Sequence, residues 1–255
     1  DVCSSDLVDA TANPTTIVPT ATGFVLPTAT NNVNGTNYVY IAIRRGLMKT
    51  PTSGTSVFIP SFQAGGGSVT TNFPADLSIN TFDNTVSTKA ITSRLTGGTL
   101  GQIDTSTEGL IAYFKFDSQT TIRDTYYGNT NNTIFWNFRR APGFCDVLCY
   151  TGTGSNTTQT HNLGVAPELI LVKSRAGAGA TGWQVYSKSL AITEYLVLNT
   201  NAAKATGITR WNGLEPTAST FSIGTAAEVN TSAATYVAYL FATCPGVSKV
   251  GSYTG

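Results

Sequence analysis

The single histidine, His161, is the first candidate for chemistry, because a Ser-His-Asp triad or an imidazole metal site would have to use it. It is followed by Asn162-Leu163-Gly164, a turn sequence that leads into an apolar run at 168–173. A metal site needs several ligands together, and no cluster of such ligands surrounds this residue in the sequence. We favour a hairpin histidine that hydrogen-bonds to backbone over catalysis or metal binding.

Carboxylates are the second candidate, since a glycosidase or depolymerase needs two of them roughly 5–10 Å apart. The acidic residues expected near strand ends are Glu108, Asp117, Asp124, Glu168 and Glu194. No pairing stands out among them. We favour charged strand ends that discourage aggregation, and we predict no catalytic residue, no cofactor and no metal.

Three aromatic residues, Trp183, Tyr186 and Trp211, could form a stacking platform for a glycan. Trp183 alternates with Val185 and Ser187, which is typical of a row facing the core, while Trp211 stands beside an Asn-Gly turn. Packing in a core or an interface is the favoured interpretation, and glycan binding through these rings is the alternative.

Three cysteines remain when Cys3 is set aside with the unusual first residues of the chain. Cys145 and Cys149 lie about 13 Å apart on an extended strand, too far to bridge each other. Buried thiols are favoured. A bridge from Cys244 to Cys145 or Cys149 is the alternative.

The composition is polar but poorly charged. Charged residues make up 11% of the chain and the net charge is +1, so there is no electrostatic footprint for nucleic acid. No apolar run reaches the length of a membrane span and no secretory signal is visible, so we predict neither nucleic-acid binding nor membrane insertion.

The sequence also repeats itself. Residues 142–152 return at 245–255, and residues 24–43 resemble 221–241. A period of about 100 residues is the size of one small domain, so the repetition predicts tandem domains rather than a solenoid. The pairs Arg44-Arg45 and Arg139-Arg140 fall at the junctions, where we expect strand-end charges that pair with an acid such as Asp146.

Strand patterns dominate between turn clusters. Apolar or alternating runs at 168–173, 183–187, 195–198 and 236–241 predict strands, and no long stretch has a helical period. Residues 74–79 echo 167–171, and 110–114 are expected to stand where 195–198 stand. The predicted fold is all-β, with tandem β-sandwich repeat domains of about 100 residues each.

Four segments follow from the period. Residues 1–43 are an artefactual start plus the C-terminal strands of a truncated first repeat. Residues 44–138 are a divergent second repeat, 139–243 a third, and 244–255 the opening of a further one. Residues 1–7 look like the translation of a sequencing adapter, which indicates a metagenomic fragment.

Several stretches resemble a repeat domain of tail-fibre and other virion structural proteins of marine tailed bacteriophages. They are residues 138–144, 161–173, 183–186, 195–200 and 235–242, with a counterpart at 40–51. The resemblance implies a β-rich virion component without a catalytic motif.

We therefore expect a non-enzymatic virion structural protein, part of a tail fibre or host-attachment apparatus, assembled in the host cytoplasm. The expected partners are further copies of the chain (a homo-oligomer, trimeric in most tail fibres), other virion proteins and a host-surface glycan. The alternatives are a carbohydrate-binding or adhesin module of a bacterial cell-surface protein and, less favoured, a polysaccharide depolymerase.

Overall fold

The computed structural model describes residues 18–19, 24–25, 49–65, 67–82, 89–96, 101–102, 114–116, 118–124, 132–179 and 181–253. The chain divides into two compact units, Asp1–Met48 and Lys49–Gly255. In the first unit, β1 (Val18–Pro19) and β2 (Phe24–Val25) pair antiparallel. The adapter-like residues 1–7, the arginine pair at 44–45 and the run at 38–43 lie outside the described residues.

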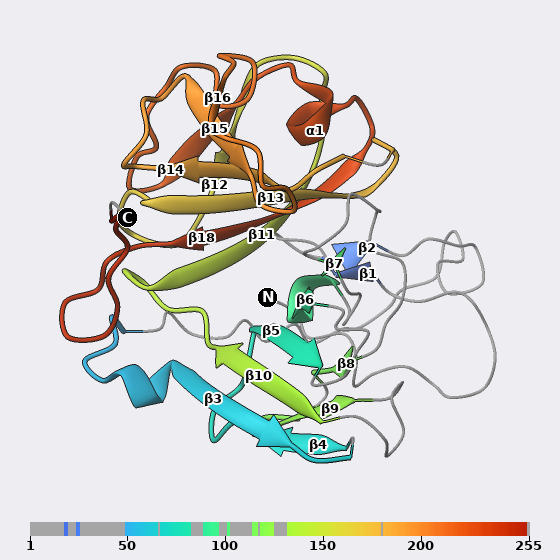
Figure 1. The fold of residues 1–255 in the computed structure, drawn as a ribbon, viewed down its shortest axis with the longest axis vertical. Coiled ribbons are helices and arrows are strands. Elements are labelled where there is room, and N and C mark those ends of the chain that lie inside the picture. The colour runs from blue at the N-terminus through green and yellow to red at the C-terminus, as the bar shows by residue number, and fades with distance from the viewer. Residues whose placement is uncertain are drawn as a thin grey trace, which may run out of the picture. The chain divides into compact units, whose positions relative to one another are not determined.

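The first half of the second unit is built from two antiparallel sheets (Figure 1). The larger has the order β3 (Phe58–Gln63), β10 (Thr133–Phe138), β5 (Leu77–Phe82), β6 (Lys89–Ser93) and β7 (Gly101–Gln102). The smaller has the order β4 (Ser68–Thr70), β9 (Thr121–Asp124) and β8 (Phe114–Lys115). Val69 and Ile122 of the small sheet share a buried cluster with Ala90 and Phe135 of the large one. The two sheets therefore enclose a core between them. Two 3-10 turns, η1 (Gly54–Ser56) and η2 (Arg94–Thr96), flank the large sheet.

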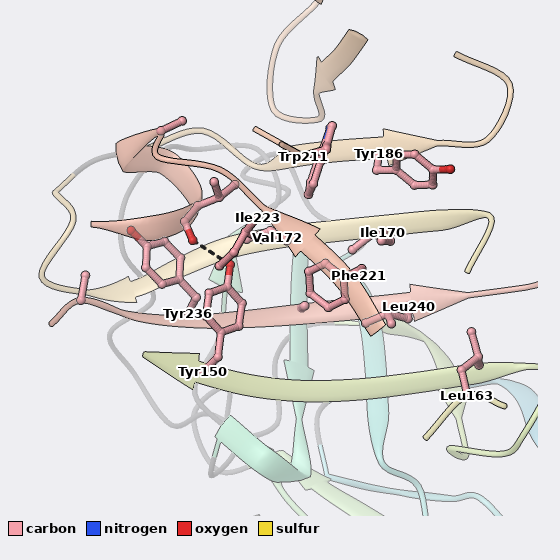
Figure 2. Close-up of a cluster of buried hydrophobic side chains, with 14 of the residues drawn as sticks. Tyr150, Leu163, Ile170, Val172, Tyr186, Trp211, Phe221, Ile223, Tyr236 and Leu240 are labelled. Atoms are coloured by element: carbon pink, nitrogen blue, oxygen red, sulfur yellow. Dashed lines mark hydrogen bonds between the residues drawn. The ribbon is translucent and has the colours of Figure 1, made fainter. Parts of the chain in front are cut away.

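The second half repeats this plan. Its larger sheet has the order β11 (Cys145–Thr151), β18 (Thr235–Phe241), β13 (Leu169–Ala176), β14 (Gln184–Ser187), β15 (Glu194–Val197) and β16 (Ala205–Thr206). Its smaller sheet pairs β12 (Thr157–Thr160) with β17 (Thr220–Ile223), and the single-turn α1 (Ala227–Asn230) precedes β18. Figure 2 shows the core, in which Phe221 and Ile223 of the small sheet meet Ile170, Val172 and Leu240 of the large one.

Two tyrosines anchor one end of this core. The Tyr150 and Tyr236 rings stack with centroids 5.1 Å apart. The Tyr150 hydroxyl donates to the Val229 carbonyl at 2.8 Å (Figure 2). The Tyr236 hydroxyl donates to the Ala227 carbonyl at 2.6 Å. Burial raises the pKa of Tyr150. Both hydroxyls thus satisfy carbonyls of the α1 turn, as buried tyrosines require.

The two halves use the same strand order. In the first, β3, β10, β5, β6 and β7 follow one another, and β11, β18, β13, β14 and β15 do so in the second. Equivalent backbone bonds fix the alignment, because Asp76 N–H donates to the Phe138 carbonyl and Glu168 N–H donates to the Phe241 carbonyl. The predicted echo between 74–79 and 167–171 is therefore a structural one.

The prediction of an all-β fold is confirmed, and two facing antiparallel sheets in each half are consistent with a β-sandwich. One detail was wrong. The counterpart of β15 is β7, since β7 pairs with β6 as β15 pairs with β14. Phe114 instead belongs to β8, which pairs with β9 in the small sheet. Residues 110–113 of that run lie outside the described residues.

Candidate functional site

The most elaborate polar arrangement of the described residues joins the two halves. We call it the junction and define it as Asp76, Arg94, Arg140 and Asp146 with the turn 141–144. Arg140 Nε lies 2.7 Å from Asp146 Oδ1, and the side chains are 14% and 4% exposed. This pairing of the arginine doublet with Asp146 was predicted and is confirmed. It ties the segment after β10 to β11.

Asp146 is also held by backbone groups. Its Oδ1 accepts from the Val147 N–H at 2.9 Å and its Oδ2 accepts from the Asn162 N–H at 2.8 Å. A buried carboxylate is stable only when it is paired and hydrogen-bonded, and both conditions are met here.

Asp76 and Arg94 extend the junction into the first half. Asp76 Oδ2 accepts from the Arg140 N–H at 2.8 Å, and Arg94 Nε lies 3.6 Å from Asp76 Oδ1. Arg94 Nη2 donates to the Ala75 carbonyl at 2.9 Å, and Nη1 donates to the Phe116 carbonyl. Four charged groups from three separate stretches of chain thus form one continuous, largely buried network.

Aromatic rings also meet where the two halves join. The Phe138 ring has its centroid 5.0 Å from that of Phe58, 6.2 Å from Phe144 and 5.9 Å from Phe241. Because Phe58 and Phe138 belong to the first half and Phe144 and Phe241 to the second, the halves share apolar contacts as well as charges. Such rings add packing energy beyond the area they bury.

The turn at the junction has a counterpart at the far end of the second half. Ala141 N–H donates to the Cys145 carbonyl and Cys244 N–H donates to the Ser248 carbonyl, and each pair forms a β-bridge. Gly143 and Gly246 have φ of 75° and 76°, a left-handed conformation that favours glycine. The repeated Pro-Gly dipeptide of the sequence therefore encodes the same turn twice.

The far end replaces the buried charges with weaker partners. Glu168 stands at the position of Asp76, and its Oε2 accepts from the Thr243 N–H at 2.9 Å and from the Thr243 hydroxyl. The Thr243 hydroxyl is the main cause that lowers the pKa of Glu168. Lys188, at the position of Arg94, lies 3.2 Å from Glu168 but is 70% exposed. The ion pair at this end is therefore exposed to solvent, whereas the equivalent pair at the junction, Asp76 with Arg94, is largely buried.

The aromatic candidates lie in the interior. Trp183, Tyr186 and Trp211 are 0%, 3% and 2% exposed. The Trp211 and Tyr186 rings meet edge to face with centroids 6.0 Å apart (Figure 2). The Trp183 ring stacks on the Tyr239 ring. The Tyr186 hydroxyl donates to Glu215 Oε2 at 2.7 Å, and burial raises its pKa. None of the three presents a ring face to a sugar, and Trp211 is buried although it stands beside a turn.

His161 is a buried turn residue. Its ring Nδ1 accepts from the Leu163 N–H at 3.2 Å, and its backbone N–H donates to the Ser219 carbonyl at 2.9 Å. Burial lowers the pKa of the imidazole. The hairpin interpretation accounts for these contacts.

The thiols are free and mostly enclosed, with Cys145 and Cys244 buried and Cys149 half-buried, so the alternative of a bridge to Cys244 was wrong. Burial raises the pKa of Cys145 and of Cys149.

The two glutamates described among the carboxylates expected near strand ends are each paired with a lysine. Glu168 pairs with Lys188 and Glu194 pairs with Lys204 at 2.6 Å. Asp124 ends β9, and Glu108 and Asp117 lie outside the described residues. In the part of the chain that the structure describes, no group of three His, Cys, Asp or Glu could hold a metal ion, and no helix is long and apolar enough to cross a membrane.

The sequence signals for the junction were only partly recognised. The arginine doublet indicated a strand-end ion pair, but nothing near it indicated Arg94, which lies far upstream. A basic residue just after a strand is common, and only the fold brings it to Asp76.

Comparison with known proteins places the chain in a family. Residues 75–255 match the family model described as a domain of unknown function, DUF7483. The match covers more than half of the sequence, so the chain belongs to the DUF7483 family. It crosses the junction and includes the whole second half. Neither the curated proteins nor the solved structures contain a match.

Proposed function

We propose that this chain is a non-enzymatic structural component of a bacteriophage virion, in a tail fibre or host-attachment apparatus. The observation that carries the proposal is the junction, where two halves of the same strand order are joined by buried ion pairs and shared aromatic rings. Such a connection suits a protein whose task is to hold modules at a fixed spacing.

The mechanism is mechanical and multivalent. A flexible linker would let neighbouring modules move independently, whereas the junction holds them through contacts on both sides of a short turn. Weak contacts presented by rigid modules raise the effective concentration at a host surface. In this proposal the ion-paired glutamates Glu168 and Glu194 and the buried His161 have structural roles and take part in no reaction. The same holds for the enclosed thiols.

The test uses a phage that carries the gene. Antibodies against residues 139–253 should label purified virions, and the purified chain should compete with the phage for adsorption to its host. In the phage, Asp146→Ala, which opens the junction, should lower adsorption. Lys204→Ala, which removes the exposed ion pair with Glu194, is the matched control and should leave adsorption unchanged.

The competing functions give different results. Label on the surface of uninfected bacteria, together with glycan binding by the isolated chain, would move the protein to the adhesin class. Release of reducing ends from capsular or lipopolysaccharide glycans, lost on Glu168→Gln or Glu194→Gln, would make it a depolymerase.

A further inference from the structure

In the part of the chain that the structure describes, one face of the first half is apolar and exposed. On the side of the large sheet that faces away from the small sheet, β3 and β10 expose Phe62, Ile134 and Trp136 to 60%, 37% and 41%, and Pro60 is exposed beside them. The strand register places Ile134 opposite Phe62 and Trp136 opposite Pro60. These four residues, which we call the Trp136 face, are contiguous. Such an uncovered apolar patch marks an interaction surface.

The equivalent face of the second half is covered. Its residues by register are Val147, Cys149, Val237 and Tyr239, on β11 and β18. Tyr239, the counterpart of Trp136, is 1% exposed, and Val147 and Val237 are 0% and 3% exposed. The same position in the fold is therefore a surface in one half and an interior in the other.

The first half supplies contacts that cover it. The Cys149 Sγ lies 3.8 Å from the Leu95 carbonyl oxygen, at a distance for a weak hydrogen bond, and the Tyr239 hydroxyl hydrogen-bonds to Ser93. Ser93 ends β6 and Leu95 lies in η2, next to Arg94 of the junction. The corner formed by residues 93–95 therefore packs against the β11–β18 face (Figure 1).

The second half has the same corner, and it is open. Ser187 lies opposite Leu169 as Ser93 lies opposite Leu77, and Lys188 N–H donates to the Glu168 carbonyl as Arg94 N–H donates to that of Asp76. Residues 187–190 are therefore the counterpart of the seated corner, and Lys188 and Ser189 are exposed.

We propose that the Trp136 face is a docking surface for a second copy of this chain, which seats its corner 187–190 there. The occupant follows from the chain's own geometry, since the corner of one half already covers the equivalent face of the next. Face and corner lie on different halves, so the contact is heterologous and leaves a free face and a free corner after each addition. Copies therefore add head to tail.

The proposal uses the geometry of the junction but not the assignment to a virion. A chain that assembles head to tail yet is absent from virions would overturn only the proposed function. A chain found in virions that stays monomeric would overturn only this inference.

The experiment compares the full chain with two variants. Trp136→Glu places a charge on the face, and Ser189→Arg places bulk and charge on the exposed corner. Ile208→Asp, which changes another exposed apolar residue, is the matched control. By sedimentation velocity over a hundredfold range of concentration, wild type and Ile208→Asp should grow beyond the dimer, while each of the two test variants should keep the monomer mass.

Mixing the two variants tests the polarity of the contact. The intact corner of Trp136→Glu should seat on the intact face of Ser189→Arg, so the mixture should form dimers and nothing larger. Trp183 and Trp211 are buried, so acrylamide quenching reports mainly on Trp136, and quenching of wild type should fall as the concentration rises. A monomeric wild type, a mixture without dimers, or a symmetric dimer insensitive to Ser189→Arg would overturn the proposal, as would protection of Trp136 by a glycan instead of by the chain.

Discussion

Two ion pairs at equivalent positions should contribute unequally to stability. Asp76 and Arg94 form one, and Glu168 and Lys188 the other. The perturbation is Arg94→Ala in the first half and Lys188→Ala in the second. The strand register and the backbone hydrogen bonds agree at the two sites, so the two substitutions differ mainly in how deeply the removed side chain is buried and in which groups it contacts.

The expected magnitudes follow from the contacts. Arg94 is 15% exposed, donates to the carbonyls of Ala75 and Phe116, and places its guanidinium 5.7 Å from the Phe116 ring centroid. Its removal leaves a 3% exposed carboxylate without this cation, which costs about 3 kcal/mol, at the lower end for breaking a buried pair. Lys188 is 70% exposed, so its loss costs under about 1 kcal/mol.

Urea unfolding followed by circular dichroism measures both changes. With an m-value of about 2 kcal/mol/M, Arg94→Ala should lower the midpoint by about 1.5 M and Lys188→Ala by less than about 0.5 M. Equal losses in the two variants would refute the reasoning, because they would mean that the burial of the junction adds nothing to the pair.

Three further predictions concern packing, pH and the core. Gly152→Ala should destabilise by at least about 2 kcal/mol in thermal unfolding, since the added Cβ would stand 2.1 Å from the Thr231 carbonyl oxygen, whereas Gly251→Ala, in open space, should be nearly neutral. Burial lowers the pKa of His161, so as the pH drops the unfolded chain takes up a proton before the folded chain does, and stability should fall below about pH 6.5. The difference in Tm between wild type and His161→Asn, measured from pH 5 to 8, isolates this effect. A difference that stays constant with pH would contradict it. Asn80 is fully buried and its side-chain amide makes no hydrogen bond with the described residues. Asn80→Val, which introduces the residue of the equivalent position in the second half, should therefore stabilise by about 1 kcal/mol in urea.

The strands of the second half could be predicted because their patterns are local. The runs at 168–173, 183–187, 195–198 and 236–241 correspond to β13, β14, β15 and β18 within a few residues. Each run is apolar or alternating and ends at a turn cluster. The order of those strands could not be derived from such patterns, because β18 pairs with both β11 and β13 across long stretches of sequence.

The first half was harder to predict because its interior is more polar. Asn80 stands where the second half has Val172, and Asn137 where it has Leu240. Asn137 accepts from the Ser78 hydroxyl and is itself fully buried. Polar residues at core positions interrupt the alternation on which strand prediction depends.

The aromatic candidates show the same limit for a site. Sequence pattern favoured core or interface packing for Trp183, Tyr186 and Trp211 but left a glycan-binding surface open as the alternative. Trp136, which occurs within the run Ile134-Phe135-Trp136, carries an equally apolar pattern and is the exposed one. Whether the outer face of a sheet is exposed depends on what packs against it. For the β11–β18 face this is a segment of the first half, which a local sequence pattern does not reveal.

The limits of the family match do not coincide with the limits of a stable fold. The match begins at residue 75, next to Asp76, and therefore includes β5, β6, β10, the junction and the second half. It leaves out β3, although every residue of β10 pairs with β3 on one side and β5 on the other. A chain trimmed to the match would turn β10 into an edge with unpaired backbone groups and would also remove Phe58 from the junction. Stability in a repeated array is a sum of module and interface terms, so losing β3 weakens the first half and, through Phe138, the interface. The segment that folds stably therefore has to include β3 as well as the residues that match the family model. The junction belongs to that folded segment and is not a separate linker between two independent halves.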